Sequence, residues 1–402
     1  MGSDGWSKAR LARLHDVMAG HAVSGYAPGI VTLVSRRGEV HADAVGSTAL
    51  GGTEPIRRDA IFRVASMTKP IVAAAALILV EECRVRLDQP IDRWLPELAD
   101  RRVLRDLDGP LDDTVPAKRP VTLRDLLTFT WGFGILIGPG GTALRQAANE
   151  LDLLNAPPLP QTSYDADEWL RRLGTLPLAH QPGEGWMYNT GSDVLGVLIS
   201  RVAGMPLEMF LRERIFEPLR MVDTSFHVPA RKLDRVPTSY LADPESGELN
   251  VYDPGHADTR WRTPPTFPSG GGGLVSTADD CLAFGQLLLN KGRYGDERIL
   301  SRPSVEAMMT DQVTPAQKAA ANFPPGFFDS RGWGFGGGVV TARTGGAAVP
   351  GTFGWDGGLG TSLWVDPSEE LIGVLLTQRA AFPLMSDVYL DFWTSVYQAI
   401  GD

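Results

Sequence analysis

A serine and a lysine three positions apart carry the clearest signal for chemistry in this 402-residue sequence. The segment Ser66-Met67-Thr68-Lys69 follows an extended run, Ile61 to Val64, and directly precedes an apolar stretch, Pro70 to Val80, which predicts a buried helix. On the first turn of that helix the two side chains share one face, so the amine can take the hydroxyl proton. The helix N-terminus stabilises a developing oxyanion, and apolar surroundings lower the pKa of a lysine. The spacing predicts an activated serine nucleophile; an N-capping serine beside a solvated lysine is the alternative.

Two other kinds of hydrolytic site have no local signature. The arrangement G-x-S-x-G is absent at every serine, and no two of the six histidines stand at H-x-H or H-x-x-x-H spacing. The glycines Gly270 to Gly273 predict a tight turn into a helix capped by Ser276 or Thr277, and no lysine follows them as a phosphate loop requires. We therefore expect neither a metal nor an organic cofactor.

Two further glycine-rich segments could complete a site. The run Pro182 to Gly191 places Tyr188 and Asn189 in a loop just before a helical pattern at 193–203. The run Phe353 to Thr361 opens a strand with enough glycine for a ligand to approach its backbone closely.

With L-L-T-F-T-W-G-F at 126–133 and G-G-G-G-L-V-S-T at 270–277, these motifs occur in an order that resembles the serine β-lactamase and penicillin-binding-protein superfamily. The resemblance extends from residue 30 to residue 376 and is closest to the class C-like branch that includes the family VIII carboxylesterases. It implies an α/β (α+β) fold of the β-lactamase/DD-peptidase type. In that fold both chain ends build one antiparallel sheet, helices flank it, and a mostly helical insertion lies between.

The resemblance also implies roles for individual residues. Ser66 would be the acylated nucleophile and Lys69 its proton acceptor. Tyr188 would exchange protons with Lys69 and serve the leaving group and the incoming water, with an adjacent ammonium favouring its phenolate. The backbone N–H groups of Ser66 and Gly358 would form the oxyanion hole.

Departures from the family pattern bear on the substrate. Trp355-Asp356-Gly357 replaces K-T-G or H-T-G, so the cation that holds a substrate carboxylate is missing and a neutral ester fits better. The Asp356 carboxylate would repel an anionic acyl group or attract a cationic one; a strand residue facing solvent or paired with an arginine is the equal alternative. In Tyr188-Asn189-Thr190 the amide is moved one position from its usual place, which puts recognition of the acyl group by Asn189 in question.

Three aromatic residues alternate in the segment at 129–133, namely Phe129, Trp131 and Phe133. Together with Trp355 they could line an apolar acyl pocket, and packing in the core is the competing interpretation.

The elements that must position these residues follow from hydrophobic periodicity and turn residues. A helix at 8–20 is followed by a hairpin from 30 to 45, and strands are expected at 361–365 and 371–376, with a third at 333–340. Helical patterns occupy 70–82, 122–128, 166–173, 193–203, 206–213, 278–290 and 303–309, and loops are expected across the rest of 104–165. We therefore predict a sheet domain, 1–66 with 325–402, a mostly helical domain, 67–324, and an active site between them.

Composition narrows the class of protein. With 38 Lys+Arg against 48 Asp+Glu the formal net charge is −10, which argues against a nucleic-acid partner. The longest uncharged apolar run has about 11 residues, short of the roughly 18 to 20 needed to cross a membrane. The basic N-terminal residues Lys8, Arg10 and Arg13 precede no apolar signal region, so a cytoplasmic protein is expected. Two cysteines, Cys83 and Cys281, are too few for a disulfide framework, and both are expected to be buried.

These observations predict a serine hydrolase that cleaves small neutral carboxylic esters through an acyl-enzyme on Ser66, with weak β-lactam hydrolysis as a companion activity. The alternatives are an acyltransferase with an alcohol or amine acceptor and a D-amino-acid peptidase or amidase, which the missing cation disfavours. From a different class comes a non-catalytic binding or sensing protein that is acylated without turnover. Oligomeric state and physiological ester have no signal in the sequence.

Overall fold

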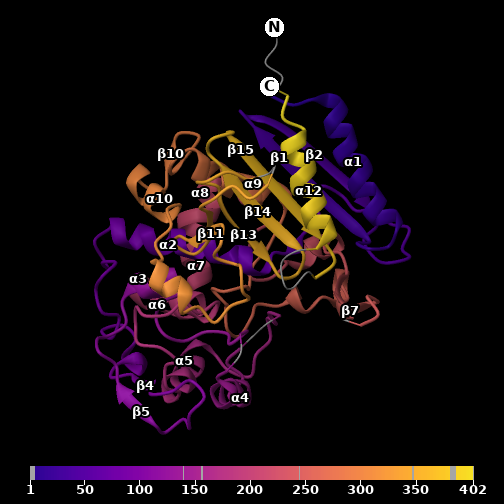
Figure 1. Cartoon of the computed structure of the whole chain (residues 1–402). Helices are drawn as coiled ribbons and strands as arrows, with labels where there is room; N and C mark the ends of the chain where they lie inside the picture. The colour runs from indigo at the N-terminus through magenta and orange to yellow at the C-terminus, as the bar shows by residue number, and fades with distance from the viewer. Residues whose placement is uncertain are drawn as a thin grey trace.

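A sheet of seven strands dominates the computed structural model, which describes residues 5–138, 140–154, 157–243, 245–345, 348–380 and 386–401. Neighbouring strands run antiparallel in the order β11-β12-β13-β14-β15-β1-β2 (Figure 1). The strands are β1 (Gly29–Arg36), β2 (Glu39–Gly46), β11 (Arg331–Trp333), β12 (Gly338–Val340), β13 (Phe353–Gly357), β14 (Thr361–Asp366) and β15 (Leu371–Thr377).

The N-terminal hairpin and the C-terminal strands meet at β1. Arg37 and Gly38 join β1 to β2 with φ of 50° and 83°, the two positive values that a tight type I′ hairpin requires. Val31 in β1 pairs with Ala44 in β2 on one side and with Leu376 in β15 on the other. The prediction that both ends of the chain build one antiparallel sheet is therefore confirmed.

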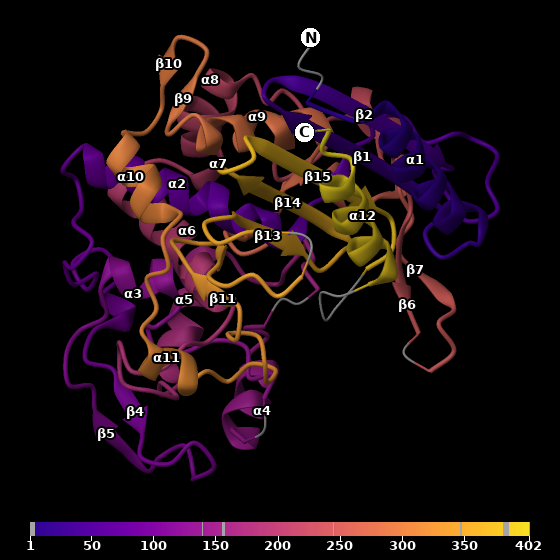
Figure 2. The same ribbon diagram turned by 45° about the horizontal axis from the view of Figure 1, so that its top comes forward.

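Helices cover both faces of the sheet. Helix α1 (Lys8–Val23) and helix α12 (Asp387–Gln398) lie side by side against one face, and α9 (Ala278–Leu289) packs on the other (Figures 1 and 2). Because both faces are covered, all eight residues of β1 are buried, including the polar residues Thr32, Ser35 and Arg36.

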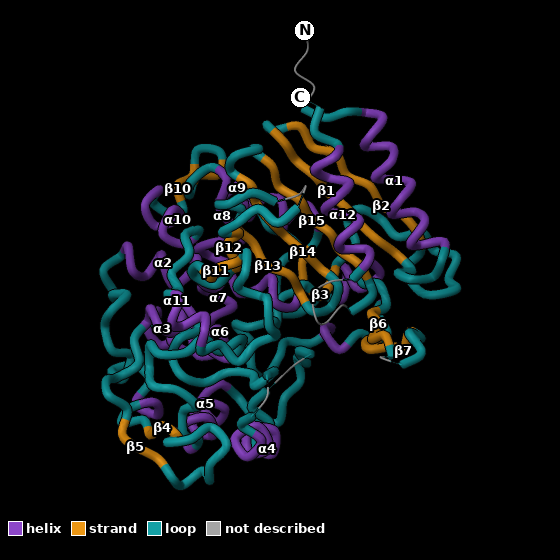
Figure 3. Tube along the Cα trace, in the orientation of Figure 1, coloured by secondary structure: helices purple, strands orange, loops and turns teal. Residues whose placement is uncertain are grey.

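The remaining helices form the part of the molecule farthest from the sheet edge at β2, where Figure 3 shows mostly helix and loop. Its centre is α2, which packs on α6 and on β13, and every residue from Thr68 to Leu79 is buried. The helices are α2 (Thr68–Glu81), α3 (Leu123–Thr128), α4 (Thr142–Glu150), α5 (Ala166–Thr175), α6 (Thr190–Ala203), α7 (Leu207–Leu211), α8 (Glu217–Leu219), α10 (Arg302–Met308) and α11 (Pro315–Ala319). A π-helical turn, Arg212–Phe216, connects α7 to α8.

Four two-stranded sheets accompany the large one. They are β3 (Phe62–Arg63) with β8 (Val275–Ser276), β4 (Arg102–Leu104) with β5 (Thr114–Pro116), β6 (Ser239–Ala242) with β7 (Leu249–Asp253), and β9 (Arg293–Tyr294) with β10 (Glu297–Arg298). The β6–β7 hairpin stands at the side of the molecule in Figure 2.

Several local expectations were wrong. The region 104–165 holds a hairpin partner, β5, and helix α4, whose buried residues are Leu144 and Ala148. The single strand expected at 333–340 is a hairpin, because the chain turns at Gly336, whose φ is +74°. Helix α12 was not expected at all. Cys83 is exposed just beyond the end of α2, whereas Cys281 is buried as expected.

No single helix among the described residues is long and apolar enough to cross a membrane. The pair Thr190–Ala203 and Leu207–Leu219, bent by 81°, passes the same test of length and composition when taken together.

Candidate active site

The chain turns sharply where the nucleophile candidate begins. β3 leads into a short 3-10 turn, η1 (Ala65–Met67), and then directly into α2. Ala65 adopts φ of +44°, a left-handed conformation that costs a non-glycine residue energy and that clusters at functional sites. The N-cap position of α2 is Met67 and no side chain caps it, so Ser66 does not serve as the N-cap.

The buried side chain of Lys69 forms a hydrogen bond with the Ser66 hydroxyl. Its Nζ donates to Ser66 Oγ at 2.9 Å and to the carbonyl oxygen of Gly271 at 2.5 Å. The side chain is buried, and this burial lowers its pKa from 10.5 to about 7, while the negative charge of Asp193 opposes the shift. A neutral amine is therefore available near neutral pH, as the apolar helix predicted.

Tyr188 faces the same pair from the loop before α6. Its hydroxyl oxygen accepts a hydrogen bond from Trp355 Nε1 at 2.7 Å, and Lys69 Nζ lies 4.7 Å from its ring centroid. Burial raises the pKa of Tyr188, and hydrogen bonds with Ser66 and Trp355 offset this only in part. This direction disfavours the expected phenolate, because desolvation of a buried hydroxyl penalises its charged form. The site holds a phenol beside an amine.

The end of β13 lies against the turn that carries Ser66. A Cβ on Gly357 would overlap the Thr361 hydroxyl and the Val64 carbonyl oxygen, so only glycine permits this approach. Thr361 Oγ1 also donates to the Val64 carbonyl oxygen at 3.1 Å. Ser66 and Gly358, whose backbone N–H groups are the predicted donors of the oxyanion hole, border one cavity.

This cavity of about 380 Å³ brings Ser66, Tyr188, Asn189 and Gly358 together. Most of its wall is apolar or small. The other lining residues are Ala65, Ile135, Pro157, Pro158, Leu241, Ala242, Ser269, Gly271, Gly272, Asp356 and Ala380. The apolar members were missed at the sequence level, because they come from separate loops and from β6 and have no shared local pattern. β6 is held there by the backbone bond from Tyr240 N to Gln378 O at 2.8 Å.

The three aromatic residues of the 129–133 segment lie behind the site and not in its wall. Phe129 stacks on Trp333 with ring centroids 4.9 Å apart and meets Tyr188 edge-on at 5.8 Å. Trp131 and Phe133 pack on each other in the main core. All three are buried and none borders the described cavity, which favours the core interpretation over the acyl-pocket interpretation.

The Asp356 carboxylate is turned away from Tyr188. Because neighbouring strand residues face opposite sides of a sheet, Trp355 points to the site while the Asp356 side chain points to the face covered by α12. Its Oδ1 accepts from Ser362 Oγ at 2.6 Å and from Trp364 Nε1 at 2.8 Å. Burial raises the pKa of Asp356, and the positive charge of Arg331 offsets this in part. This placement favours a structural partner over a contact with the acyl group.

Asn189 borders the cavity in a strained conformation. Its φ of +83° and ψ of −70° immediately precede α6, and non-glycine strain of this kind is characteristic of functional sites. Its role toward an acyl group stays a prediction.

No group of three or more His, Cys, Asp and Glu side chains with metal-ligand geometry is present in the part of the chain that the structure describes. The cavity brings the hydroxyl-bearing residues Ser66 and Tyr188 together, and the amine of Lys69 contacts Ser66 Oγ.

The chain is similar to known proteins along most of its length. Residues 14–390 match the model of the Beta-lactamase family. The chain is 40% identical over 364 residues to Protein Rv1367c of Mycobacterium tuberculosis, which covers 89% of this chain and 87% of that protein. It is 34% identical over 372 residues to esterase EstB of Burkholderia gladioli, covering 88% and 86%.

Among solved structures it superposes on EstCE1, a hydrolase with promiscuous acyltransferase activity, with a TM-score of 0.78, 27% identity and coverage of 97% and 99%. The same fold is found in penicillin-binding-protein homologues, which confirms the predicted β-lactamase/DD-peptidase architecture. By sequence, by fold and by the family match over nearly its whole length, this chain belongs to the Beta-lactamase family.

Proposed function

We propose that the protein is a serine hydrolase that cleaves small neutral carboxylic esters through an acyl-enzyme on Ser66. The observation that carries the proposal is the 2.9 Å contact of a buried lysine amine, with a pKa of about 7, with the Ser66 hydroxyl at the wall of an apolar cavity. The names of two relatives, an esterase and a hydrolase, support the same class of reaction.

In the acylation step the neutral amine of Lys69 takes the Ser66 proton as Oγ attacks the ester carbonyl carbon. The carbonyl oxygen becomes an oxyanion that the N–H groups of Ser66 and Gly358 stabilise. Tyr188, a phenol because burial raises its pKa, gives its proton to the departing alkoxide and regains one from the Lys69 ammonium. The alcohol leaves, and Ser66 carries the acyl group.

Deacylation reverses these proton movements. Lys69 is again neutral and, through Tyr188, accepts the proton of an incoming water that attacks the acyl carbon. The ester bond to Oγ breaks, Oγ recovers a proton, and the carboxylic acid leaves. In this proposal the site takes Ser66 and Gly358 from the predicted sheet domain and Lys69 and Tyr188 from the predicted helical domain.

The side chains around the proposed site indicate the class of substrate. Trp355 occupies the position where β-lactamase relatives carry a cation, so no positive charge at this position awaits a substrate carboxylate. Apolar side chains such as Ile135 and Leu241 border the cavity instead. A neutral ester fits this wall, and β-lactams, which carry a carboxylate, would be turned over weakly. A peptidase acting on D-amino-acid termini is disfavoured for the same reason.

Acyl transfer is the second candidate, favoured by the promiscuous acyltransferase activity named for EstCE1. It differs from hydrolysis only in the acceptor that attacks the acyl-enzyme. A non-catalytic acylatable sensor is the third, and the neutral Lys69 beside a protonated Tyr188 argues against it because this pair supplies both proton transfers.

The test is intact-protein mass after incubation with p-nitrophenyl butyrate, recorded together with p-nitrophenol release. Wild type should release many equivalents, Ser66→Ala should release none, and Ser24→Ala, an exposed serine at the end of α1, should match wild type. A single butyryl group on Ser66 without further release of p-nitrophenol would support the sensor. Formation of methyl butyrate from added methanol would support the transferase. Full activity in Ser66→Ala would overturn the proposal.

A further inference from the structure

A buried carboxylate outside the serine, lysine and tyrosine set is connected to the lysine through one backbone peptide. Asp193 lies in the first turn of α6, and its Oδ1 accepts from Ser269 Oγ at 2.6 Å and from the Gly271 N–H at 2.9 Å. The carbonyl oxygen of that same Gly271 accepts from Lys69 Nζ at 2.5 Å. A continuous chain of hydrogen bonds therefore runs from α6 through the glycine loop to Ser66.

The tetraglycine run, Gly270 to Gly273, allows this loop to lie directly against α6. A Cβ on Gly270 would overlap the Ser192 carbonyl oxygen, and a Cβ on Gly271 would come within 2.9 Å of Asp193 Oδ2. Side chains at either position would push the loop away from the helix and carry the Gly271 carbonyl away from Lys69. The motif is explained by close backbone approach and not by phosphate binding.

Charge connects the same two residues. The titratable groups that face Lys69 are Asp193 from α6 and Tyr188 from the loop before it; Asp356 of β13 acts on Tyr188. Of these, Asp193 is the charge that stabilises a protonated Lys69. Its own pKa is raised by burial, and the bonds from Ser269 and Gly271 together with Lys69 favour its ionised form.

We propose that Asp193 is a positioning residue for this reaction: it fixes the Gly271 carbonyl that holds Lys69 Nζ against Ser66 Oγ, and it supplies the counter-charge for the ammonium formed when Ser66 is deprotonated. The inference rests on the proposed function. Asp193 acts through Gly271 and Lys69 and is not among the residues that border the cavity.

The test measures kcat/KM for p-nitrophenyl butyrate against pH with the full chain. Asp193→Asn keeps an acceptor oxygen for Ser269 and Gly271 but removes the charge. The acid limb of its kcat/KM profile should move to lower pH, because Lys69 then loses its proton more readily. The plateau of the profile should fall, because the amine is a weaker base. Asp193→Ala also releases the loop, and its plateau should fall by roughly 10²-fold.

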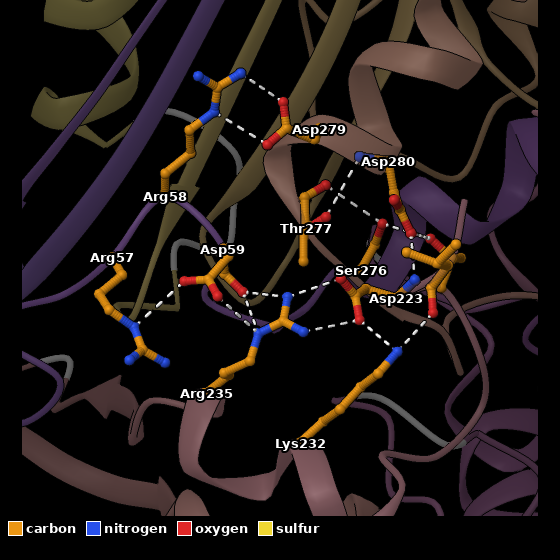
Figure 4. Close-up of polar contacts among 12 residues, drawn as sticks. Arg57, Arg58, Asp59, Asp223, Lys232, Arg235, Ser276, Thr277, Asp279 and Asp280 are labelled. Atoms are coloured by element: carbon orange, nitrogen blue, oxygen red, sulfur yellow. Dashed lines mark hydrogen bonds and ion pairs between the residues drawn. The ribbon is translucent and has the colours of Figure 1, made fainter. Parts of the chain in front are cut away.

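Asp280 provides a matched control. It is a buried carboxylate in the first turn of α9 that accepts from one hydroxyl, Thr224 Oγ1 at 2.8 Å, and one backbone N–H, that of Asp223 at 2.8 Å. Figure 4 shows it beside Asp223 and Ser276, in a cluster that includes Lys232 and Arg235. Asp280→Asn should change the melting temperature without moving the acid limb.

The outcomes separate cleanly. If wild type shows no Ser66-dependent release, the proposed function fails. If wild type is active and the acid limb of Asp193→Asn stays with that of wild type and Asp280→Asn, this inference alone is overturned. If Asp193→Asn does not fold, Ser269→Ala decides, since it removes one donor from the same carboxylate: a roughly tenfold loss of kcat/KM at unchanged melting temperature supports the inference, and unchanged kcat/KM overturns it.

Discussion

The indole Nε1 of Trp355 donates a 2.7 Å hydrogen bond to the hydroxyl oxygen of Tyr188. Both side chains are buried, and the Trp355 ring meets Trp333 edge-on with centroids 4.6 Å apart. The indole engages one lone pair of the phenol oxygen and so restricts the orientation of the Tyr188 hydroxyl. A neutral donor thus orients Tyr188.

Replacing this donor should impair chemistry more than binding. In Trp355→Phe the phenol loses one fixed partner worth about 1 kcal/mol, so kcat for p-nitrophenyl butyrate should fall roughly fivefold with little change in KM. Steady-state kinetics measure both values. Trp393→Phe removes an indole that donates to Ser362 at 3.3 Å, away from Tyr188, and should leave kcat near wild type. Equal kcat in the Trp355 variant and wild type would contradict the orienting role.

Activity should rise with pH through a midpoint near 7. Burial lowers the Lys69 pKa to about 7, so below that pH the amine is protonated and cannot accept the Ser66 proton, whereas above it the base is free. Burial raises the Tyr188 pKa, so the phenol stays protonated and no decline from its ionisation should appear up to about pH 9. The profile of kcat/KM from about pH 5 to about pH 9 checks this. A profile that stays flat across this range would show that no group with a pKa near 7 acts as the base.

We expect Asp356 to have no influence on the preference for positively or negatively charged acyl groups. Its Oδ1 is engaged by Ser362 and Trp364, so the ratio of kcat/KM for esters with ammonium-ended and carboxylate-ended acyl chains should be the same in wild type and Asp356→Ala. The same variant leaves two buried donors without an acceptor, which should lower the free energy of unfolding by about 1–3 kcal/mol. Denaturant titration measures the second effect, and Asp356→Asn, which keeps an acceptor oxygen, should lose less. A changed substrate ratio would restore the carboxylate as a specificity residue.

Length of the acyl chain should depend on Ile135. This residue borders the 380 Å³ cavity, and Ile135→Trp would fill part of it. The variant should lose kcat/KM for p-nitrophenyl octanoate by at least about tenfold more than for the acetate, because the longer chain needs the occupied volume. Ile137→Trp, two residues along and outside this cavity, is the control. Equal losses for both esters would place the acyl chain elsewhere.

Features decided by local forces were predictable. The Arg37-Gly38 turn, the helix that begins after Ser66 and the Thr277 cap, whose hydroxyl accepts from Asp280 N, follow from residues adjacent in the sequence. The motif resemblance then related distant segments that no periodicity connects.

Features decided by packing between distant segments were not predictable from the sequence. Nothing local distinguishes a tryptophan that donates to Tyr188 from one in the core, and Phe129 and Trp131 were equally suited to either place. The Tyr188 pKa depends on total burial, which only the folded chain defines. Likewise, the link from Asp193 to Gly271 spans 78 positions and leaves no pattern in either segment.

The pairing of β1 with β15 sets an order of events during synthesis. The second edge of β1, which contains Val31, is covered only when Leu376 and the rest of β15 have been synthesised. A growing chain therefore carries an unpaired strand edge through most of translation. Gly358 and Ser66 likewise meet only after β13 has left the ribosome. Ser66 and Lys69 are therefore synthesised long before Gly358, the second predicted oxyanion donor, and the proposed site is complete only in a late step of folding.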